Sequence, residues 1–255
     1  MTSAPTPQSL FGLDGRTALV TGGSSGIGRA IAIALAGAGA RVLIAARTEA
    51  TITATVETIL ADGGTADGIR ADLSTRAGSH ALAETAGDVD ILVSSAGINL
   101  RPPLAELDED TWDATMAVNL EAPFVLGQRL APAMAARGFG RLIHLSSQQA
   151  HRPFADSGAY GVSKAAVEAL ARSQAEAWSP RGVTANVLVP GFVQTALNRR
   201  LSADPARVEA LAARTLSGRN GEPEDFAGAA VFLASPASAY VTGQSIAVDG
   251  GFSVH

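Results

Sequence analysis

The sequence of 255 residues contains no cysteine. This absence excludes disulfide bonds, thiolate zinc sites, iron–sulfur clusters and a thiol nucleophile. The four histidines lack the spacing of metal ligands, so no metal site is expected. Charged residues are scarce at 17%, below the roughly 25% that is typical of soluble domains. Hydrophobic residues make up 47% of the chain, which supplies a core and excludes disorder throughout the chain.

The sequence also lacks an excess of positive charge and a long apolar run. Its 19 basic and 24 acidic residues give a net charge of −5, so a basic surface for nucleic acid is not expected. The longest apolar stretch, Ala30 to Ala40, is interrupted by glycine and is too short to cross a bilayer. No Lys or Arg precedes Arg16, so the basic start of a signal peptide is missing. These features predict a cytoplasmic protein without nucleic-acid or membrane partners.

Segments typical of strands and helices alternate along the chain. Short apolar runs predict strands at 17–21, 41–46, 67–71, 89–94, 141–146, 183–188 and 245–248. Helical patterns lie between them at 27–38, 48–60, 76–86, 112–137, 158–178 and 224–234. This order predicts an α/β fold: a single doubly wound domain of the Rossmann type, with a seven-stranded parallel sheet and helices on both faces.

The chain shows no internal linker or repeat. Residues 1–10 contain two prolines and no periodicity, so they are interpreted as a flexible tail. Residues 11–255 are expected to form one dinucleotide-binding catalytic domain. Within it, the arginine-rich segment 196–220 is interpreted as a substrate lid at the rim of the sheet.

A glycine-rich turn follows the first predicted strand. It reads Thr21-Gly-Gly-Ser-Ser-Gly-Ile-Gly28 and leads directly into a predicted helix. Glycine allows the backbone to approach a pyrophosphate closely, and the helix N-terminus offers free N–H groups to the phosphates. An isolated glycine cluster can be a plain flexible turn. Between a buried strand and a helix, however, it predicts a dinucleotide site.

The end of the second predicted strand indicates which dinucleotide is bound. NAD sites usually carry an acid there, but this chain has Ala46 followed by Arg47. A guanidinium binds a 2′-phosphate through paired hydrogen bonds. We therefore predict a preference for NADP(H), with NAD(H) as the second candidate. The alternative is that Arg47 is an ordinary surface charge.

Tyr160 and Lys164 are four residues apart, which places them on the same face of a helix. Lys164 is the single lysine among the 19 basic residues. A nearby cation favours the phenolate and would lower the Tyr160 pKa from about 10. Tyr160 is therefore a candidate general acid/base, the alternative being an ordinary surface tyrosine.

Two further polar residues are candidates for the same site. Ser147 follows the strand 141–146, where its hydroxyl would hold and polarise a substrate carbonyl, and Ser146 is the alternative. Asn119 lies in an apolar helical stretch and must find partners if it is buried. Those partners are a water linked to Lys164 or, alternatively, a plain structural hydrogen bond.

Together these motifs resemble the short-chain dehydrogenase/reductase (SDR) family, in its compact single-domain subgroup. The resemblance runs from about Leu13 to Gly251, with a departure at Ser94-Ser95, where the family often has two asparagines. It implies that Tyr160 donates the proton, Lys164 holds the nicotinamide ribose, Ser147 orients the carbonyl and Asn119 completes a proton relay. It also implies a set of cofactor-binding residues: Gly22, Ser24, Ser25, Ile27, Arg47, Asp72, Leu73, Ser95, Ala96, Gly97, Tyr160, Lys164, Pro190, Gly191, Val193 and Thr195.

The resemblance further implies a homotetramer, or a homodimer, built on the helices 112–137 and 158–178. The run from Ala96 to Pro103 is similar to the gluconate 5-dehydrogenase branch, and the chain also resembles 3-oxoacyl reductases. Four arginines near the expected pocket would suit a carboxylate: Arg101, Arg152, Arg199 and Arg200. The alternative is that these arginines are solvated, and a hydrophobic ketone, a 3-oxoacyl thioester and a polyol remain open as substrates.

The favoured function is an NADP(H)-dependent oxidoreductase that interconverts a ketone and a secondary alcohol. The alternatives are a non-catalytic dinucleotide-binding redox sensor and an NAD-dependent sugar-acid or polyol dehydrogenase. A lyase or epimerase with tightly held cofactor is a minor option, because related enzymes of that kind are usually longer.

Overall fold

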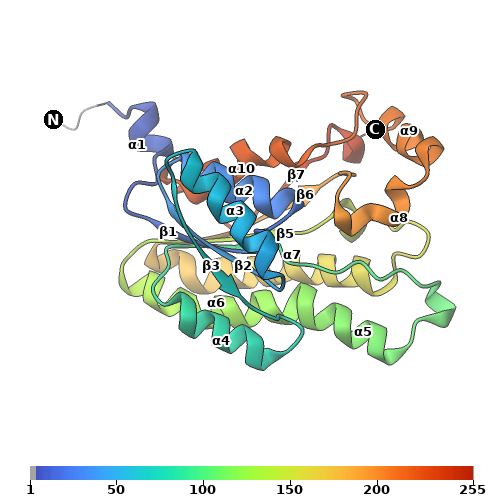
Figure 1. The fold of residues 1–255 in the computed structure, drawn as a ribbon, viewed down its shortest axis with the longest axis horizontal. Helices are drawn as coiled ribbons and strands as arrows, with labels where there is room; N and C mark the ends of the chain where they lie inside the picture. The colour runs from blue at the N-terminus through green and yellow to red at the C-terminus, as the bar shows by residue number, and fades with distance from the viewer. Residues whose placement is uncertain (1–3, 255) are drawn as a thin grey trace.

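Seven parallel strands form the centre of the protein, in the order β3-β2-β1-β4-β5-β6-β7. The structure, a computed structural model, describes residues 4–254 (Figure 1). Every residue of β6 is buried because helices cover both faces of the sheet, which explains why the strands are apolar runs. The strands are β1 Thr17–Thr21, β2 Arg41–Ala46, β3 Thr65–Arg70, β4 Ile91–Ser94, β5 Gly140–Leu145, β6 Val183–Pro190 and β7 Ser245–Val248.

Neighbouring residues of a strand point to opposite faces of the sheet, and each face has its own hydrophobic cluster. In β1, Val20 packs in a cluster with Ile31, whereas Leu19 packs in a second cluster with Leu126. Helices α2, α3 and α10 cover the first face, and α4, α6 and α7 cover the second (Figure 1). Their bounds are α2 Gly26–Gly37, α3 Glu49–Ala61, α10 Ala227–Ala234, α4 Arg76–Ala86, α6 Ala122–Ala136 and α7 Gly158–Trp178.

The predicted fold class is confirmed: a seven-stranded parallel sheet is flanked by helices. The strands lie where the apolar runs predict them, with small differences such as the extension of β6 to Pro190. β1 pairs with β2 on one side and with β4 on the other, so the order of the strands reverses beside β1. Ligands of such sheets bind at the carboxyl ends of the strands, next to that reversal.

The predicted helix 112–137 is interrupted by a wider turn. Helix α5, Glu109–Met116, continues into a π-helix, Ala117–Glu121, before α6 begins. The N–H of Ala122 donates to the carbonyl of Ala117, a hydrogen bond that spans five residues. Single π-turns inside α-helices are frequent at functional sites, and this one contains Asn119.

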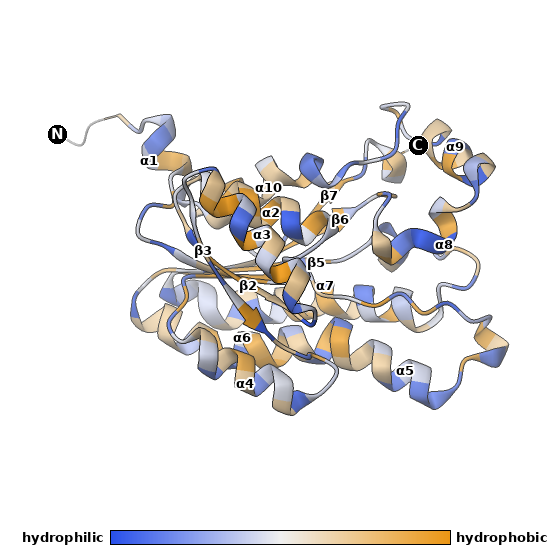
Figure 2. Cartoon of the chain, in the orientation of Figure 1, coloured by the Kyte–Doolittle hydropathy of each residue, from blue (hydrophilic) through white to orange (hydrophobic). Residues whose placement is uncertain are grey.

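The two segments that were expected to lie off the sheet contain short helices. In the described part of the expected tail, α1, Pro7–Phe11, is capped by reciprocal hydrogen bonds between Thr6 and Ser9. The arginine-rich segment contains α8, Arg199–Ser202, and α9, Pro205–Ala213. They lie at the end of the molecule opposite α1 (Figure 1), and α8 is mainly hydrophilic (Figure 2).

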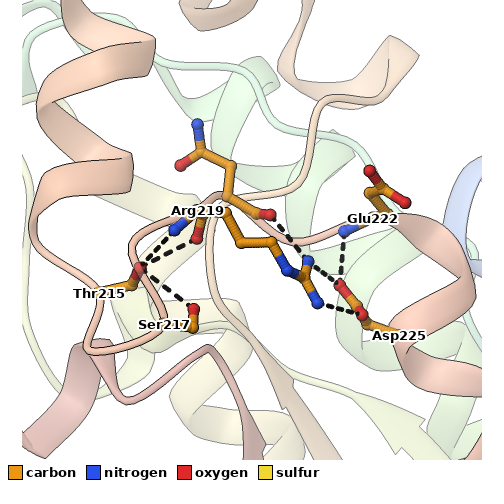
Figure 3. Close-up of polar contacts among 6 residues, drawn as sticks. Thr215, Ser217, Arg219, Glu222 and Asp225 are labelled. Atoms are coloured by element: carbon orange, nitrogen blue, oxygen red, sulfur yellow. Dashed lines mark hydrogen bonds and ion pairs between the residues drawn. The ribbon is translucent and has the colours of Figure 1, made fainter.

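A compact set of polar contacts fixes the chain after α9 (Figure 3). Arg219 binds Asp225 through two contacts of 2.7 Å, Nη1 to Oδ2 and Nη2 to Oδ1. The Thr215 hydroxyl accepts from the Arg219 N–H, and Asp225 also accepts from the Glu222 N–H. The Arg219 hydrogen bond, together with that of Glu222, lowers the pKa of Asp225 to about 2. These contacts anchor the far end of the arginine-rich segment.

Candidate active site

A cavity opens at the carboxyl ends of β1, β4, β5 and β6. Most residues that the sequence predicts for the site line it: Gly22, Ser25, Ile27, Ser95, Ala96, Gly97, Ser147, Tyr160, Lys164, Pro190, Gly191, Val193 and Thr195. The strand ends thus bring together segments that are distant in the sequence. The predicted residues outside this lining are Ser24, Arg47, Asp72, Leu73 and Asn119.

The glycine-rich turn forms a cradle that has no room for side chains. Gly22 has a φ of 67°, and a Cβ atom on it would lie 2.8 Å from the Ala96 nitrogen. A Cβ atom on Gly28 would lie 2.4 Å from the Gly22 oxygen and 2.8 Å from Ser95 Oγ. Ser25 precedes α2 without making a side-chain cap, so this helix presents free N–H groups to the cavity. The cradle therefore suits a pyrophosphate.

Tyr160 and Lys164 lie on α7 and are almost completely buried. The Tyr160 hydroxyl is hydrogen-bonded to the Ser147 side chain, and Lys164 Nζ lies 5.6 Å from the centre of the Tyr160 ring. Lys164 Nζ donates to the Leu145 carbonyl over 2.8 Å. The Ser146 hydroxyl is not directed at Tyr160, because it donates to Glu168 over 2.6 Å. Ser147, rather than Ser146, therefore faces Tyr160.

Burial dominates the protonation of this pair. It raises the pKa of the Tyr160 hydroxyl above its ordinary value, although the Ser147 hydrogen bond and the Arg101 charge act in the opposite direction. Burial also lowers the pKa of Lys164 to about 8. The sequence-based expectation of a lowered Tyr160 pKa is therefore wrong for this structure, since the desolvation of the hydroxyl outweighs the Ser147 hydrogen bond and the Arg101 charge.

Asn119 joins three segments next to the cavity. Its Nδ2 donates to Ser163 Oγ and to the Ile98 carbonyl, each over 3.0 Å, and its Oδ1 accepts from the Ile98 N–H over 2.9 Å. These bonds attach the π-helix to α7 and to the loop after β4. The plain structural hydrogen bonds that were one expectation for Asn119 are present, and the relay to Lys164 stays a prediction.

Three residues predicted to bind the cofactor, Arg47, Asp72 and Leu73, lie outside the cavity lining. Arg47 is exposed after β2, and its carbonyl accepts a hydrogen bond of 3.3 Å from Arg70 Nε. Hydrogen bonds from Ser74 and the Arg47 charge lower the pKa of Asp72. The side chain of Leu73 instead lies in the hydrophobic core, so it is the backbone at this position that remains available for a ligand.

Of the four arginines that would suit a carboxylate, only Arg101 lines the cavity. Arg101 donates through Nε to the Asp156 carbonyl over 3.2 Å. Arg200 lies 3.5 Å from the Asp156 carboxylate, and it, Arg152 and Arg199 are not part of the cavity wall. Arg207 of α9, which the sequence analysis missed, does line it. Its only signal in the sequence is its place in the arginine-rich segment.

The cavity wall has a one-sided charge. Its ionisable cationic residues are Arg101, Lys164 and Arg207, and no Asp or Glu occurs among the described residues that line it. Burial lowers the pKa of Arg101, and the charges of Arg200 and Arg207 lower it further, against the opposing effect of Asp156. Gln148, Gln149 and Phe154 also line this cavity.

Residues 4–254 contain neither a candidate metal site nor a candidate membrane-spanning helix. No group of three or more His, Cys, Asp or Glu side chains in that range is arranged to hold a metal ion. No helix within the same range is long and apolar enough to cross a membrane.

Comparisons with known proteins match the chain over nearly its whole length. The family model described as enoyl-(acyl carrier protein) reductase matches residues 22–253. Galactitol 2-dehydrogenase (L-tagatose-forming) of Cereibacter sphaeroides is 41% identical, over 97% of this chain and 98% of that protein. Gluconate 5-dehydrogenase of Gluconobacter oxydans is 37% identical, over 96% and 97% of the two chains.

Solved structures give the same result. A gluconate 5-dehydrogenase of Burkholderia cenocepacia, in complex with NADP and tartrate, superimposes with a TM-score of 0.93. It is 38% identical and covers 98% of this chain and 100% of its own. A 3-oxoacyl (acyl-carrier-protein) reductase of Agrobacterium tumefaciens with NADP bound has a TM-score of 0.92 and 39% identity, over 96% and 97% of the chains. The chain belongs to the short-chain dehydrogenase/reductase family. Within it, the relatives are dehydrogenases and reductases that act on CH–OH groups, and this chain is an oxidoreductase of that kind.

Proposed function

We propose that the protein is an NADP(H)-dependent oxidoreductase that interconverts a ketone and a secondary alcohol, with Tyr160 as the general acid/base. The observation that carries this proposal is the position of Tyr160. Its hydroxyl is hydrogen-bonded to Ser147, Lys164 lies on the same helix face, and all three line the cavity that the glycine cradle opens into. A redox sensor needs the cradle but has no use for this acid/base pair.

The described residues fit a bound dinucleotide. Gly22 and Gly28 pack so closely against backbone that a Cβ atom on either would collide with it, and the first residues of α2, which have no side-chain cap, line the cavity. Lys164 would hold the nicotinamide ribose, and Val193 and Thr195 the carboxamide. When bound, the cofactor supplies the hydride. We assign the other cofactor contacts predicted from the sequence to the remaining residues of the glycine-rich turn and to the residues at the ends of the strands.

The chain's own residues would supply and direct the proton. Because burial raises the pKa of Tyr160, its hydroxyl is protonated at neutral pH and ready to donate to the carbonyl oxygen during reduction. Ser147 would hold that oxygen by a second hydrogen bond. Asn119 would support the relay that returns a proton to this site, through the backbone and Ser163 contacts that it makes beside Lys164.

Cofactor preference provides one prediction. Replacing Arg47 with Ala is expected to weaken NADPH binding roughly 10- to 100-fold, because one or two charged hydrogen bonds to the 2′-phosphate are lost. NADH binding should change less than about twofold, since NADH carries no such phosphate. Titration of both cofactors measures this. Arg41, at the other end of β2 and paired with Asp67, is the matched control as Arg41→Ala. Equal losses for NADPH and NADH would contradict the assignment.

The charge of the cavity favours an anionic substrate. With Lys164 used for the ribose, Arg101 and Arg207 remain as cations at the substrate end, and no acid among the lining residues of the described chain neutralises them. A guanidinium binds a carboxylate well. The related gluconate 5-dehydrogenase structure that holds NADP also holds tartrate, a dicarboxylate. We therefore infer that the substrate is an oxo acid or a keto-sugar acid.

The second prediction tests this substrate class. Replacing Arg207 with Ala is expected to raise KM for a carboxylated ketone roughly 10-fold, and to leave KM for a neutral ketone of the same size unchanged. Arg199→Ala is the control, because Arg199 belongs to the same segment but not to the cavity wall. If both ketones respond alike to Arg207→Ala, the carboxylate assignment is withdrawn and a neutral polyol or ketone becomes the better substrate class.

One assay tests the proposed reaction as a whole. Purified protein is mixed with NADPH or NADH and a panel of oxo acids, keto-sugars and neutral ketones, and the nicotinamide absorbance is followed. Turnover that prefers NADPH is the expected result. Tight NADPH binding without turnover of any panel member would favour the redox sensor instead.

We propose that residues 11–255 act as one catalytic domain, that 196–220 cover the substrate, and that the protein is cytoplasmic. We further propose a homotetramer, or a homodimer, because Trp112, Phe124 and Val162 expose apolar surface on α5, α6 and α7. Sedimentation or light scattering measures that state directly.

A further inference from the structure

A buried carboxylate on α7 joins three parts of the protein. Glu168 lies one helical turn beyond Lys164, and its side chain is 5% exposed. It accepts hydrogen bonds from Ser146 Oγ over 2.6 Å and from Ser245 Oγ over 3.0 Å. The Nε2 atom of His151 lies 3.1 Å from Glu168 Oε1. Glu168 therefore connects the end of β5, the start of β7 and the turn that follows β5.

The contacts of Glu168 lie on both sides of Ser147 in the chain. Ser146 directly precedes Ser147 in the chain and His151 follows it by one short turn, so the contacts of one carboxylate flank Ser147 on both sides. That carboxylate is on the helix that carries Tyr160. The distance between the Ser147 and Tyr160 hydroxyls thus depends on how firmly the flanking residues are held.

The turn between the two contacts contains several hydrogen bonds of its own. Ser147 Oγ accepts from the Gln149 N–H over 3.2 Å, and the Ser147 carbonyl accepts from the Ala150 N–H over 2.9 Å. The N–H of His151 donates to the Gln148 carbonyl over 3.1 Å. A displacement of His151 is therefore passed on to Ser147 rather than absorbed within the turn.

Glu168 is a buried carboxylate that makes several polar contacts. A buried carboxylate is costly unless it is paired and hydrogen-bonded, so removal of its partners or of the carboxylate itself changes the arrangement locally. Glu168 is absent from the cavity wall, so it does not touch the substrate or the cofactor. Its effect on the reaction has to pass through the residues that it holds.

We propose that Glu168 is a positioning residue that fixes Ser147 opposite Tyr160, with His151 as its second attachment to the turn. This inference rests on the proposed function, because that function gives Ser147 and Tyr160 their roles. The carboxylate holds both sides of Ser147 to α7, and so sets the geometry in which the carbonyl oxygen meets two hydroxyl groups.

A double-mutant comparison tests the proposal. In the wild-type background, Glu168→Ala is expected to lower kcat roughly 10-fold while NADPH affinity stays within about twofold, since the group acts through Ser147. In a Ser147→Ala background the same change should lower kcat less than about twofold, because the hydroxyl that Glu168 positions is already gone. An equal loss in both backgrounds would overturn the proposal and leave Glu168 with a general structural role.

Matched variants keep the test informative if Glu168→Ala fails to fold. Glu168→Gln keeps one oxygen acceptor and places an amide donor where the second oxygen was. A serine hydroxyl can donate or accept, so both Ser146 and Ser245 can still be bonded and the variant should recover most of kcat. His151→Asn removes the outer attachment at a side chain that is 59% exposed, so folding should be retained while kcat falls severalfold. Glu176→Ala removes an exposed carboxylate of the same helix and should change nothing. Wild-type kcat in a folded His151→Asn variant would refute the positioning role even where Glu168→Ala cannot be measured.

Amide hydrogen exchange separates this proposal from the proposed function. Exchange at residues 148–152 is expected to be faster in Glu168→Ala and His151→Asn than in wild type, and unchanged in Glu176→Ala. This readout needs no substrate, so it decides the attachment of the turn even if every ketone in the panel is inactive. Unchanged exchange in Glu168→Ala would show that the carboxylate does not hold the turn.

Discussion

Replacing Tyr160 with Phe is expected to lower turnover by roughly 10²- to 10⁴-fold, the usual contribution of a positioned acid/base group. Phe keeps the buried ring but loses the hydroxyl that is hydrogen-bonded to Ser147. NADPH affinity should remain within about twofold, because the ring still fills its place beside Lys164. Steady-state kinetics and a cofactor titration measure the two quantities separately.

The second tyrosine of the chain offers a control for this experiment. Tyr240 is fully exposed, so Tyr240→Phe should leave turnover and binding unchanged. If Tyr160→Phe retained most of the turnover, the proton would come from another group and Tyr160 would lose its role. A variant that no longer binds NADPH would instead show that the hydroxyl holds the cofactor rather than the reacting carbonyl.

Replacing Gly28 with Ala is expected to weaken NADPH binding roughly 10- to 100-fold and to destabilise the fold by about 1–3 kcal/mol. The added Cβ would lie 2.4 Å from the Gly22 oxygen and 2.8 Å from Ser95 Oγ. The closer of these atoms belongs to the backbone of the cradle, so the turn itself has to move. That movement disturbs the surface on which the pyrophosphate would rest.

Helix α2 contains its own control for the Gly28 experiment. Gly37 lies at the last position of the same helix, and a Cβ atom added there would meet no other atom within 4 Å, so Gly37→Ala should leave NADPH binding unchanged. It should also stabilise the protein by up to about 0.5–1 kcal/mol, because Ala loses less backbone entropy in a helix. Thermal unfolding and cofactor titration test both variants. Wild-type NADPH affinity in Gly28→Ala would mean that the cradle is not where the cofactor binds.

Local patterns predicted the fold, and they pointed to residues that the structure brings together at one cavity. The glycine turn and the Tyr160–Lys164 spacing are short-range signals, and the parallel sheet brings the ends of its strands together whatever the loops do. The helix α1 had a signal too, since Thr6 is a good N-cap and Pro7 suits the first helical turn. That signal was overlooked because the segment has no apolar periodicity.

Other features depend on contacts that no local pattern encodes. Arg207 lines the cavity together with Arg101, which is far away in the chain, and Glu168 is hydrogen-bonded to the equally distant Ser245. The direction of the Tyr160 pKa shift depends on how deeply the hydroxyl is buried, which spacing along a helix does not reveal. The π-helix escaped notice because its apolar pattern resembles that of an uninterrupted α-helix.

The π-helix has a consequence for the length of the chain. A π-turn holds one more residue than an α-turn, so the helical stretch from α5 to α6 contains an insertion relative to a regular helix. Removing that extra residue would restore regular winding and leave the buried faces of α5 and α6 where they are. What would be lost is the wide turn that carries Asn119 to Ile98 and Ser163. At this point the number of residues in the protein is set by the site and not by the packing of the helix.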